Sequence, residues 1–85
     1  MSERRDEIRA VLFDVLGTIA PEADLAGLDP LKSLRDQIDL DSMDFLNVVI
    51  RLHERLAVEI PESDYGKLAT VAGAMDYLAN RCGAA

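Results

Sequence analysis

Residues 41–56 read DSMDFLNVVIRLHERL and predict an amphipathic helix with a wide apolar surface. At about 100° per residue, one group of apolar side chains falls within an arc of roughly 100°, which is wide enough to face a core. This group comprises Phe45, Val48, Val49, Leu52 and Leu56. Met43, Leu46 and Ile50 widen the apolar surface to roughly 220°. A small helical domain has little with which to cover both arcs, so we expect part of this helix to stay exposed as a partner site.

The remaining periodicity completes an all-α fold, a small four-helix bundle with three longer helices and one short helix. Ser2 is suited to cap the first helix and Thr70 the last, while Pro61 suits the first turn of the short one. The helices are expected over residues 2–19, 42–57, 62–67 and 70–80.

Residues 20–41 form a long connection between the first two of the longer helices. Connections in compact domains usually span about four to six residues, so we expect apolar anchors to hold this one against the core. The candidate anchors are Leu25, Leu28, Leu31, Leu34, Ile38 and Leu40. We expect residues 1–85 to form one domain, with residues 81–85 as a frayed tail.

Sixteen acidic residues against nine basic residues give the 85-residue chain a formal charge of −7. This balance does not supply the clustered lysine and arginine that neutralise phosphates, so we expect neither nucleic-acid binding nor adsorption to an anionic membrane. No apolar run approaches the roughly eighteen residues of a membrane-spanning helix, and the N-terminus does not have a signal-peptide pattern. We therefore expect a cytoplasmic monomer whose partners present basic surfaces.

Neither a catalytic site nor a metal site is expected. Cys82 cannot form an internal disulfide, and with the one histidine of the chain it cannot complete a zinc site. Ser42 and His53 lie about 16 Å apart along the predicted helix, too far for nucleophilic catalysis, and we interpret His53 as a rim residue. The acids of residues 36–44 lack the glycine and the spacing of a calcium loop. The chain alone is therefore not predicted to be an enzyme.

Ser42, at the start of the predicted helix, has two interpretations. As an N-cap, its hydroxyl would accept a backbone hydrogen bond and stabilise the helix by about 1 kcal/mol. Alternatively, it carries a phosphorylated group, because a phosphodiester on this oxygen would lie beside unpaired N–H groups at the positive end of the helix dipole. Position alone favours the N-cap.

The sequence at this helix start resembles the phosphopantetheine-attachment motif of acyl carrier proteins. The stretch IDLDSMDFL at residues 38–46 contains the Asp-Ser-Met core of that motif. VEIPE at residues 58–62 is similar to the segment before the family's short third helix, and LATV and AMDYL within residues 68–78 resemble its last helix. The resemblance is clear over residues 34–80, and the first helix and the long loop fit it by arrangement.

The resemblance implies a freestanding acyl carrier in fatty-acid, polyketide or specialised lipid biosynthesis. A phosphopantetheinyl transferase would attach 4′-phosphopantetheine to Ser42, and the thiol of that group would hold acyl groups as thioesters. Acyl-transferring and acyl-modifying enzymes with basic docking patches would be the other partners. The implied partner-binding residues are Asp41, Met43, Asp44, Leu46, Ile50 and Glu54. The residues that would line an acyl pocket, which core packing explains equally well, are Phe45, Val49, Leu52, Ile60, Leu68 and Ala74.

Three features depart from the family pattern. Asp39 stands where the family usually has glycine, and aspartate tolerates a positive φ better than most residues. Leu34 occupies a position that is often aromatic. Arg51, His53 and Arg55 stand where fatty-acid carriers tend to have acidic or small residues, which favours a dedicated pathway over the housekeeping fatty-acid partners.

Two other functions stay open at this point. An aminoacyl or peptidyl carrier fits less well, because such carriers more often show a Gly-Gly-x-Ser setting. A non-catalytic adaptor would use the acidic second helix as a docking surface and would need no prosthetic group. The variant Ser42→Ala separates the classes, since a carrier would lose all activity and keep its fold.

Overall fold

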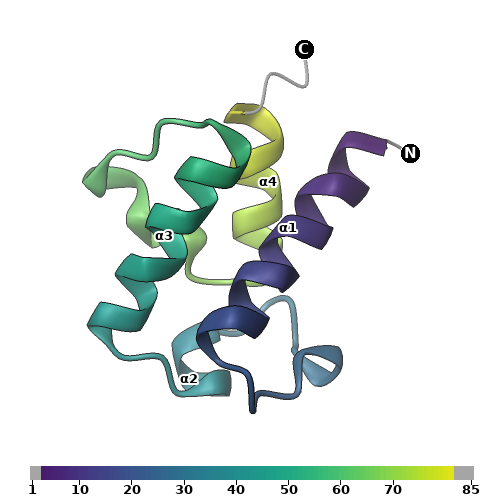
Figure 1. The fold of residues 1–85 in the computed structure, drawn as a ribbon, viewed down its shortest axis with the longest axis vertical. Helices are drawn as coiled ribbons and strands as arrows, with labels where there is room; N and C mark the ends of the chain where they lie inside the picture. Colours follow the sequence, from purple (N-terminus) through teal and green to yellow (C-terminus); the bar gives the residue numbers. More distant parts are fainter. Residues whose placement is uncertain (1–2, 82–85) are drawn as a thin grey trace.

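Three longer helices surround one apolar core in the computed structural model, which describes residues 3–81 (Figure 1). In chain order the elements are α1 (Glu3–Ile19), η1 (Leu25–Gly27), α2 (Leu34–Ile38), α3 (Ser42–Leu56), η2 (Glu62–Leu68) and α4 (Val71–Arg81). Helix α1 packs against α3 and α4, and η2 packs against α4. This arrangement confirms the all-α prediction, with α1, α3 and α4 as the longer helices and η2 as the predicted short one.

The core is built from the apolar stripe of each longer helix. Val48, Val49 and Leu52 of α3 are buried, and Phe45 and Leu56 are partly buried at the margins of the same face. Burial of each large aliphatic side chain stabilises the fold by about 1.5–3 kcal/mol. The inward face predicted for α3 is therefore confirmed. The buried residues of α1, at steps of three and four, are Ile8, Leu12, Val15 and Leu16.

The connection between α1 and α3 contains two short helical elements, η1 and α2, that the sequence did not predict. Leu34 and Leu40 are buried anchors, as expected. Leu31 is a wrong prediction, because it is 78% exposed and its N–H donates to Asp29 Oδ1 at 2.9 Å in a surface turn. The anchors that pack partly buried against the core are Leu25, Leu28 and Ile38.

Hydrogen bonds hold this connection in place beside the start of α4. The Leu34 N–H donates to the Ala69 carbonyl at 2.8 Å. The side chain of Gln37 accepts from the Asp29 N–H at 2.7 Å and donates to the Asp29 carbonyl at 2.9 Å. These bonds fix a segment whose composition alone indicated only a loop.

The connection ends in a left-handed turn at Asp39, whose φ is 56°. Aspartate visits this region more readily than most residues with a side chain. The expectation that Asp39 takes over a turn usually made by glycine is confirmed by this conformation. The turn is followed by the buried side chain of Leu40, which leads directly to the start of α3.

A polar cluster around Asp64 ties η2 to α4. The Tyr77 hydroxyl donates to Asp64 Oδ2 at 2.7 Å, and Arg81 Nη2 donates to the same oxygen at 3.1 Å. The Tyr77 bond is the main cause that lowers the pKa of Asp64. Because the pKa of Asp64 is lowered in the folded state, the cluster stabilises the fold above about pH 4, and this contribution is lost as the pH falls through the lowered value.

The chain ends are only partly covered by the described residues. Arg81, the first residue of the predicted tail, belongs to α4. The expected cap at Ser2, the remaining tail and Cys82 lie outside the described residues. Over the described part of the chain, each helix is too short or too polar to cross a membrane.

Gly73 lies where α4 meets the end of η2. The Thr70 hydroxyl accepts from the Gly73 N–H at 2.9 Å, which confirms the predicted cap of α4. A Cβ atom at Gly73 would lie 2.8 Å from the Lys67 carbonyl oxygen and 3.0 Å from Thr70 Oγ1. This close approach explains why glycine stands at this position, although glycine in a helix interior costs about 1 kcal/mol of stability relative to alanine.

We predict that Gly73→Ala lowers the free energy of unfolding by about 1–3 kcal/mol, because the added methyl group must displace backbone atoms. Gly66→Ala is the matched control, since a Cβ atom there meets nothing within 4 Å. The control should keep its stability or gain up to about 1 kcal/mol. Urea denaturation followed by circular dichroism measures both, and equal stability of the two variants would contradict the close approach at Gly73.

Candidate functional site

Ser42 is the first residue of α3, but it does not cap the helix. The N-cap is Asp41, whose backbone is extended (φ −86°, ψ −178°). Asp41 Oδ1 accepts from the Asp44 N–H at 2.8 Å, and the Asp41 carbonyl accepts from the Phe45 N–H at 2.9 Å. The interpretation of Ser42 as the N-cap is therefore wrong, because the aspartate one position earlier already satisfies the helix start.

The cap at Asp41 leaves the Ser42 side chain available. Ser42 is exposed, and its hydroxyl makes no hydrogen bond with any residue in the range 5–81. The N–H groups of Ser42 and Met43 belong to the first helical turn, where no intrahelical acceptor exists. An anionic group bonded to the Ser42 oxygen would lie beside these donors, at the positive end of the helix.

The residues just before Ser42 fix the position at which α3 begins. Leu40 is buried, and its carbonyl accepts a hydrogen bond from Arg35 Nε at 3.2 Å. The left-handed turn at Asp39 precedes it. The sequence did not predict this role of Arg35, because no sequence pattern indicates a contact between a basic side chain and a backbone carbonyl.

An apolar strip stays exposed on α3 next to Ser42. Met43 is 68% exposed, Leu46 39% and Ile50 44%. This confirms that the helix keeps part of its wide apolar arc outside the core. We name the predicted partner-binding residues of this helix and its cap the α3 surface: Asp41, Met43, Asp44, Leu46, Ile50 and Glu54. Their role in binding partners stays a prediction.

Most of the six candidates for an acyl pocket are packed in the core. Phe45 and Ile60 are partly buried and lie against that core. The packing accounts for all six as stabilising residues, and a role in holding an acyl group stays a prediction. The buried candidates are Val49, Leu52, Leu68 and Ala74.

A cavity of about 200 Å³ lies between α3 and the segment that leads into η2. Two of the acyl-pocket candidates, Val49 and Ile60, line it. Beside it, the rings of Phe45 and Tyr65 meet edge to face with centroids 6.4 Å apart. The lining residues that the sequence did not assign to an acyl pocket are Ile50, His53, Glu59 and Tyr65.

Two of the three unusual bases on α3 have contacts that support the fold. Arg55 Nη1 lies 2.7 Å from Asp14 Oδ2 and so links α3 to α1. The ring Nδ1 of His53 is hydrogen-bonded to the Val58 carbonyl, just beyond the helix end. Arg51 is exposed. The contacts of Arg55 and His53 give a structural reason for two departures that the sequence linked to partner choice.

Comparisons with known proteins agree with this geometry. The family model described as a phosphopantetheine attachment site matches residues 6–78. An acyl carrier protein of Acidothermus cellulolyticus is 34% identical over 82 residues, which cover 94% of each chain. The chain belongs to the acyl carrier protein family. Another acyl carrier protein, from Renibacterium salmoninarum, is 35% identical over 78 residues, covering 88% of this chain and 91% of the relative.

The fold of this acyl carrier is also shared with a solved structure. The acyl carrier protein of Enterococcus faecalis, whose structure was examined for its high thermal stability, is 25% identical and superposes with a TM-score of 0.71. The match covers 91% of this chain and 96% of the other. The family's prosthetic group is phosphopantetheine, as the matched family model describes.

We predict that Asp41→Ala lowers the free energy of unfolding by about 1 kcal/mol, because α3 loses its cap. Ser42→Ala should change it by less than about 0.5 kcal/mol, since the exposed hydroxyl contributes no bond. Urea denaturation of the unmodified protein measures both values. If Ser42→Ala lowered the free energy of unfolding more than Asp41→Ala, Ser42 rather than Asp41 would be the cap of α3.

Proposed function

We propose that this chain carries acyl groups on 4′-phosphopantetheine attached to Ser42. The observation that carries the proposal is the exposed Ser42 hydroxyl, which the cap at Asp41 leaves without a hydrogen bond among the described residues. When bound, the prosthetic group supplies a terminal thiol that holds the acyl group as a thioester. We further propose a freestanding monomer in the cytoplasm, without catalytic activity, that serves fatty-acid, polyketide or specialised lipid biosynthesis.

The attachment step replaces the hydroxyl proton of Ser42. In the proposed reaction, the Ser42 oxygen forms a bond to the phosphorus of coenzyme A that bears the pantetheine. The pyrophosphate bond breaks, and adenosine 3′,5′-bisphosphate leaves. The base and the Mg²⁺ for this step belong to the phosphopantetheinyl transferase. The N–H groups of Ser42 and Met43 favour the resulting phosphodiester anion, whereas the Asp41 and Asp44 carboxylates oppose it.

The α3 surface is the proposed docking site for the transferase and for the enzymes that load and modify the acyl group. Its carboxylates attract basic patches over a distance set by the salt concentration. Its three exposed apolar side chains lose water on contact and so supply binding energy. Because the surface adjoins Ser42 along α3, a docked enzyme would meet the attachment point.

The cavity between α3 and the start of η2 is the proposed contact for an acyl chain. Val49 and Ile60 offer it apolar surface, while His53 and Glu59 line it with polar groups. At about 200 Å³ it is below the roughly 300–1,000 Å³ usual for ligand pockets. A long chain would therefore have to displace neighbouring side chains such as Tyr65, whose ring meets that of Phe45.

We predict that incubation with coenzyme A and a broad-specificity phosphopantetheinyl transferase adds the mass of one phosphopantetheine to the protein. Ser42→Ala should gain none, because the acceptor oxygen is gone. Ser63→Ala is the matched control, since Ser63 is also exposed in the first turn of a helical element, and it should be modified like the wild type. Intact-mass spectrometry measures all three.

The same measurement separates the alternatives. Modification of Ser42→Ala would overturn the assignment of the serine. Absence of any mass gain, also with the transferase of the host organism, would favour the adaptor over the carrier.

We predict that Met43→Ala and Leu46→Ala each lower kcat/KM of the transferase by about fivefold or more, because each removes apolar contact from the docked surface. Leu31→Ala is the matched control, since Leu31 is an even more exposed leucine outside the α3 surface. It should change kcat/KM by less than about twofold. Equal losses in all three variants would count against a docking role of the α3 surface.

A further inference from the structure

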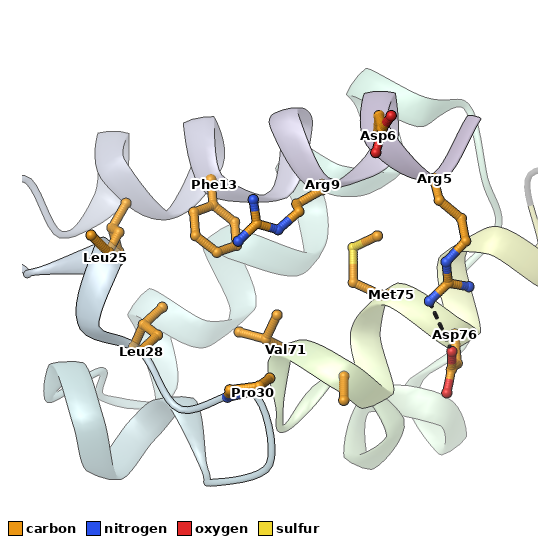
Figure 2. A pocket seen from close by; sticks show the side chains of 12 residues that line it. Arg5, Asp6, Arg9, Phe13, Leu25, Leu28, Pro30, Val71, Met75 and Asp76 are labelled. Carbon is orange, nitrogen blue, oxygen red and sulfur yellow. Dashed lines mark hydrogen bonds and ion pairs between the residues drawn. The ribbon is translucent and has the colours of Figure 1, made fainter. Parts of the chain in front are cut away.

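A second groove lies away from α3, between α1, the η1 region and the start of α4 (Figure 2). Its volume is about 400 Å³, within the roughly 300–1,000 Å³ typical of small-molecule sites. Residues of α3 do not contribute to its lining, so it is separate from Ser42 and from the α3 surface. The larger apolar residues of its lining are Phe13, Leu25, Leu28, Pro30, Val71 and Met75.

The walls of this groove are held together by contacts already present in the fold. The Ala72 N–H donates to the Pro30 carbonyl at 2.9 Å, which joins the connection to α4. At one end, Arg5 Nη2 lies 3.1 Å from Asp76 Oδ1 and links α1 to α4. Figure 2 shows Leu25 and Leu28 at the opposite end. The groove is therefore formed in the folded chain before any ligand arrives.

Arg9 is a cation on this groove that the fold does not use in an ion pair. Its guanidinium carbon lies 4.5 Å from the centroid of the Phe13 ring, which stacks against it (Figure 2). Among the described residues, Arg9 has no carboxylate partner within ion-pair distance. The stacking holds the planar guanidinium in place while its N–H donors remain available for a planar anion.

The acidic side chains that line the groove restrict the chemistry of its ligand. Asp76 is engaged with Arg5, whereas Asp6, which also lines the groove, opposes an anion. The formal charge of −7 repels anions at long range. A ligand that combines a negative head with an apolar tail can offset this repulsion, because the apolar lining adds favourable contact.

We propose that this groove binds a free medium-chain carboxylate. The carboxylate pairs with the guanidinium of Arg9, and the aliphatic tail lies along Leu28, Val71 and Met75. A protein partner fits the groove less well. A stable protein interface buries about 800 Å² of surface on each partner, whereas this groove has the size of a small-molecule site. The site does not require the Ser42 modification, so the two proposals fail separately.

The test is a titration of the unmodified, ¹⁵N-labelled full chain with octanoate, followed by amide chemical shifts. We expect saturable shifts confined to α1 near Phe13 and to the residues around Leu28 and Val71. Octan-1-ol, with the same tail and no charge, should bind the wild type about tenfold more weakly than octanoate. Shifts that cluster on α3 and η2, or the absence of saturable binding, would overturn the proposal.

Charge variants test the role of Arg9 directly. Arg9→Gln should weaken octanoate binding about tenfold, and Arg9→Lys should bind with intermediate affinity because it keeps the charge without the planar fork. Asp6→Asn should strengthen binding, since it removes the opposing charge. Arg51→Gln, which changes an exposed arginine on α3, is the matched control and should leave the affinity unchanged.

Each outcome decides the proposal. Equal affinity of the wild type and Arg9→Gln, with native-like spectra for both, would overturn it. Because Arg9 is exposed, these variants are expected to fold. If Arg9→Gln does not fold, Arg9→Lys and Asp6→Asn give the same decision, and unchanged affinity in both would reject the site.

Discussion

The hydrogen bond from the Asp44 N–H to the Asp41 carboxylate fixes where α3 starts. Since successive residues of a helix are rotated by about 100°, burial of the apolar stripe decides which side chains face the core. Val48 and Val49 turn inward, and Met43 stays at the surface. The same bond spares the Ser42 hydroxyl from capping. One short-range contact therefore leaves the serine available at the end of α3 that also exposes Met43.

The cap depends in turn on how the long connection is held. The Gln37 side chain is hydrogen-bonded to the Asp29 backbone within the connection. The Leu34 N–H donates to the Ala69 carbonyl, just before α4. Leu40 has a buried side chain, and its carbonyl accepts a hydrogen bond from Arg35. These contacts hold the backbone in position immediately before Asp41. The long connection therefore begins α3 at a defined residue.

The sequence predicted the elements of this fold that have a periodic apolar pattern. Apolar steps of three and four revealed the longer helices and the inward face of α3, because burial imposes that period. The five residues of α2 are too few for such a period, so α2 was missed. Asp41 and Ser42 are both good capping residues at adjacent positions, and only the backbone conformation decides between them. Leu31 failed as an anchor for a similar reason, since the turn that exposes it is a matter of backbone geometry.

The ion pairs explain how a strongly acidic chain keeps its acids available on α3. Arg5 joins α1 to α4, Arg55 joins α3 to α1, and each takes up an acid outside the α3 surface. Arg81 does the same for Asp64 of η2. Exposed ion pairs stabilise a fold by only about 0–1 kcal/mol each, so their main effect is on the distribution of charge. Arg5, Arg55 and Arg81 are occupied by these pairs, and the carboxylates of the α3 surface make no ion pair within residues 5–81. A basic partner at the α3 surface would therefore meet carboxylates that these ion pairs do not neutralise.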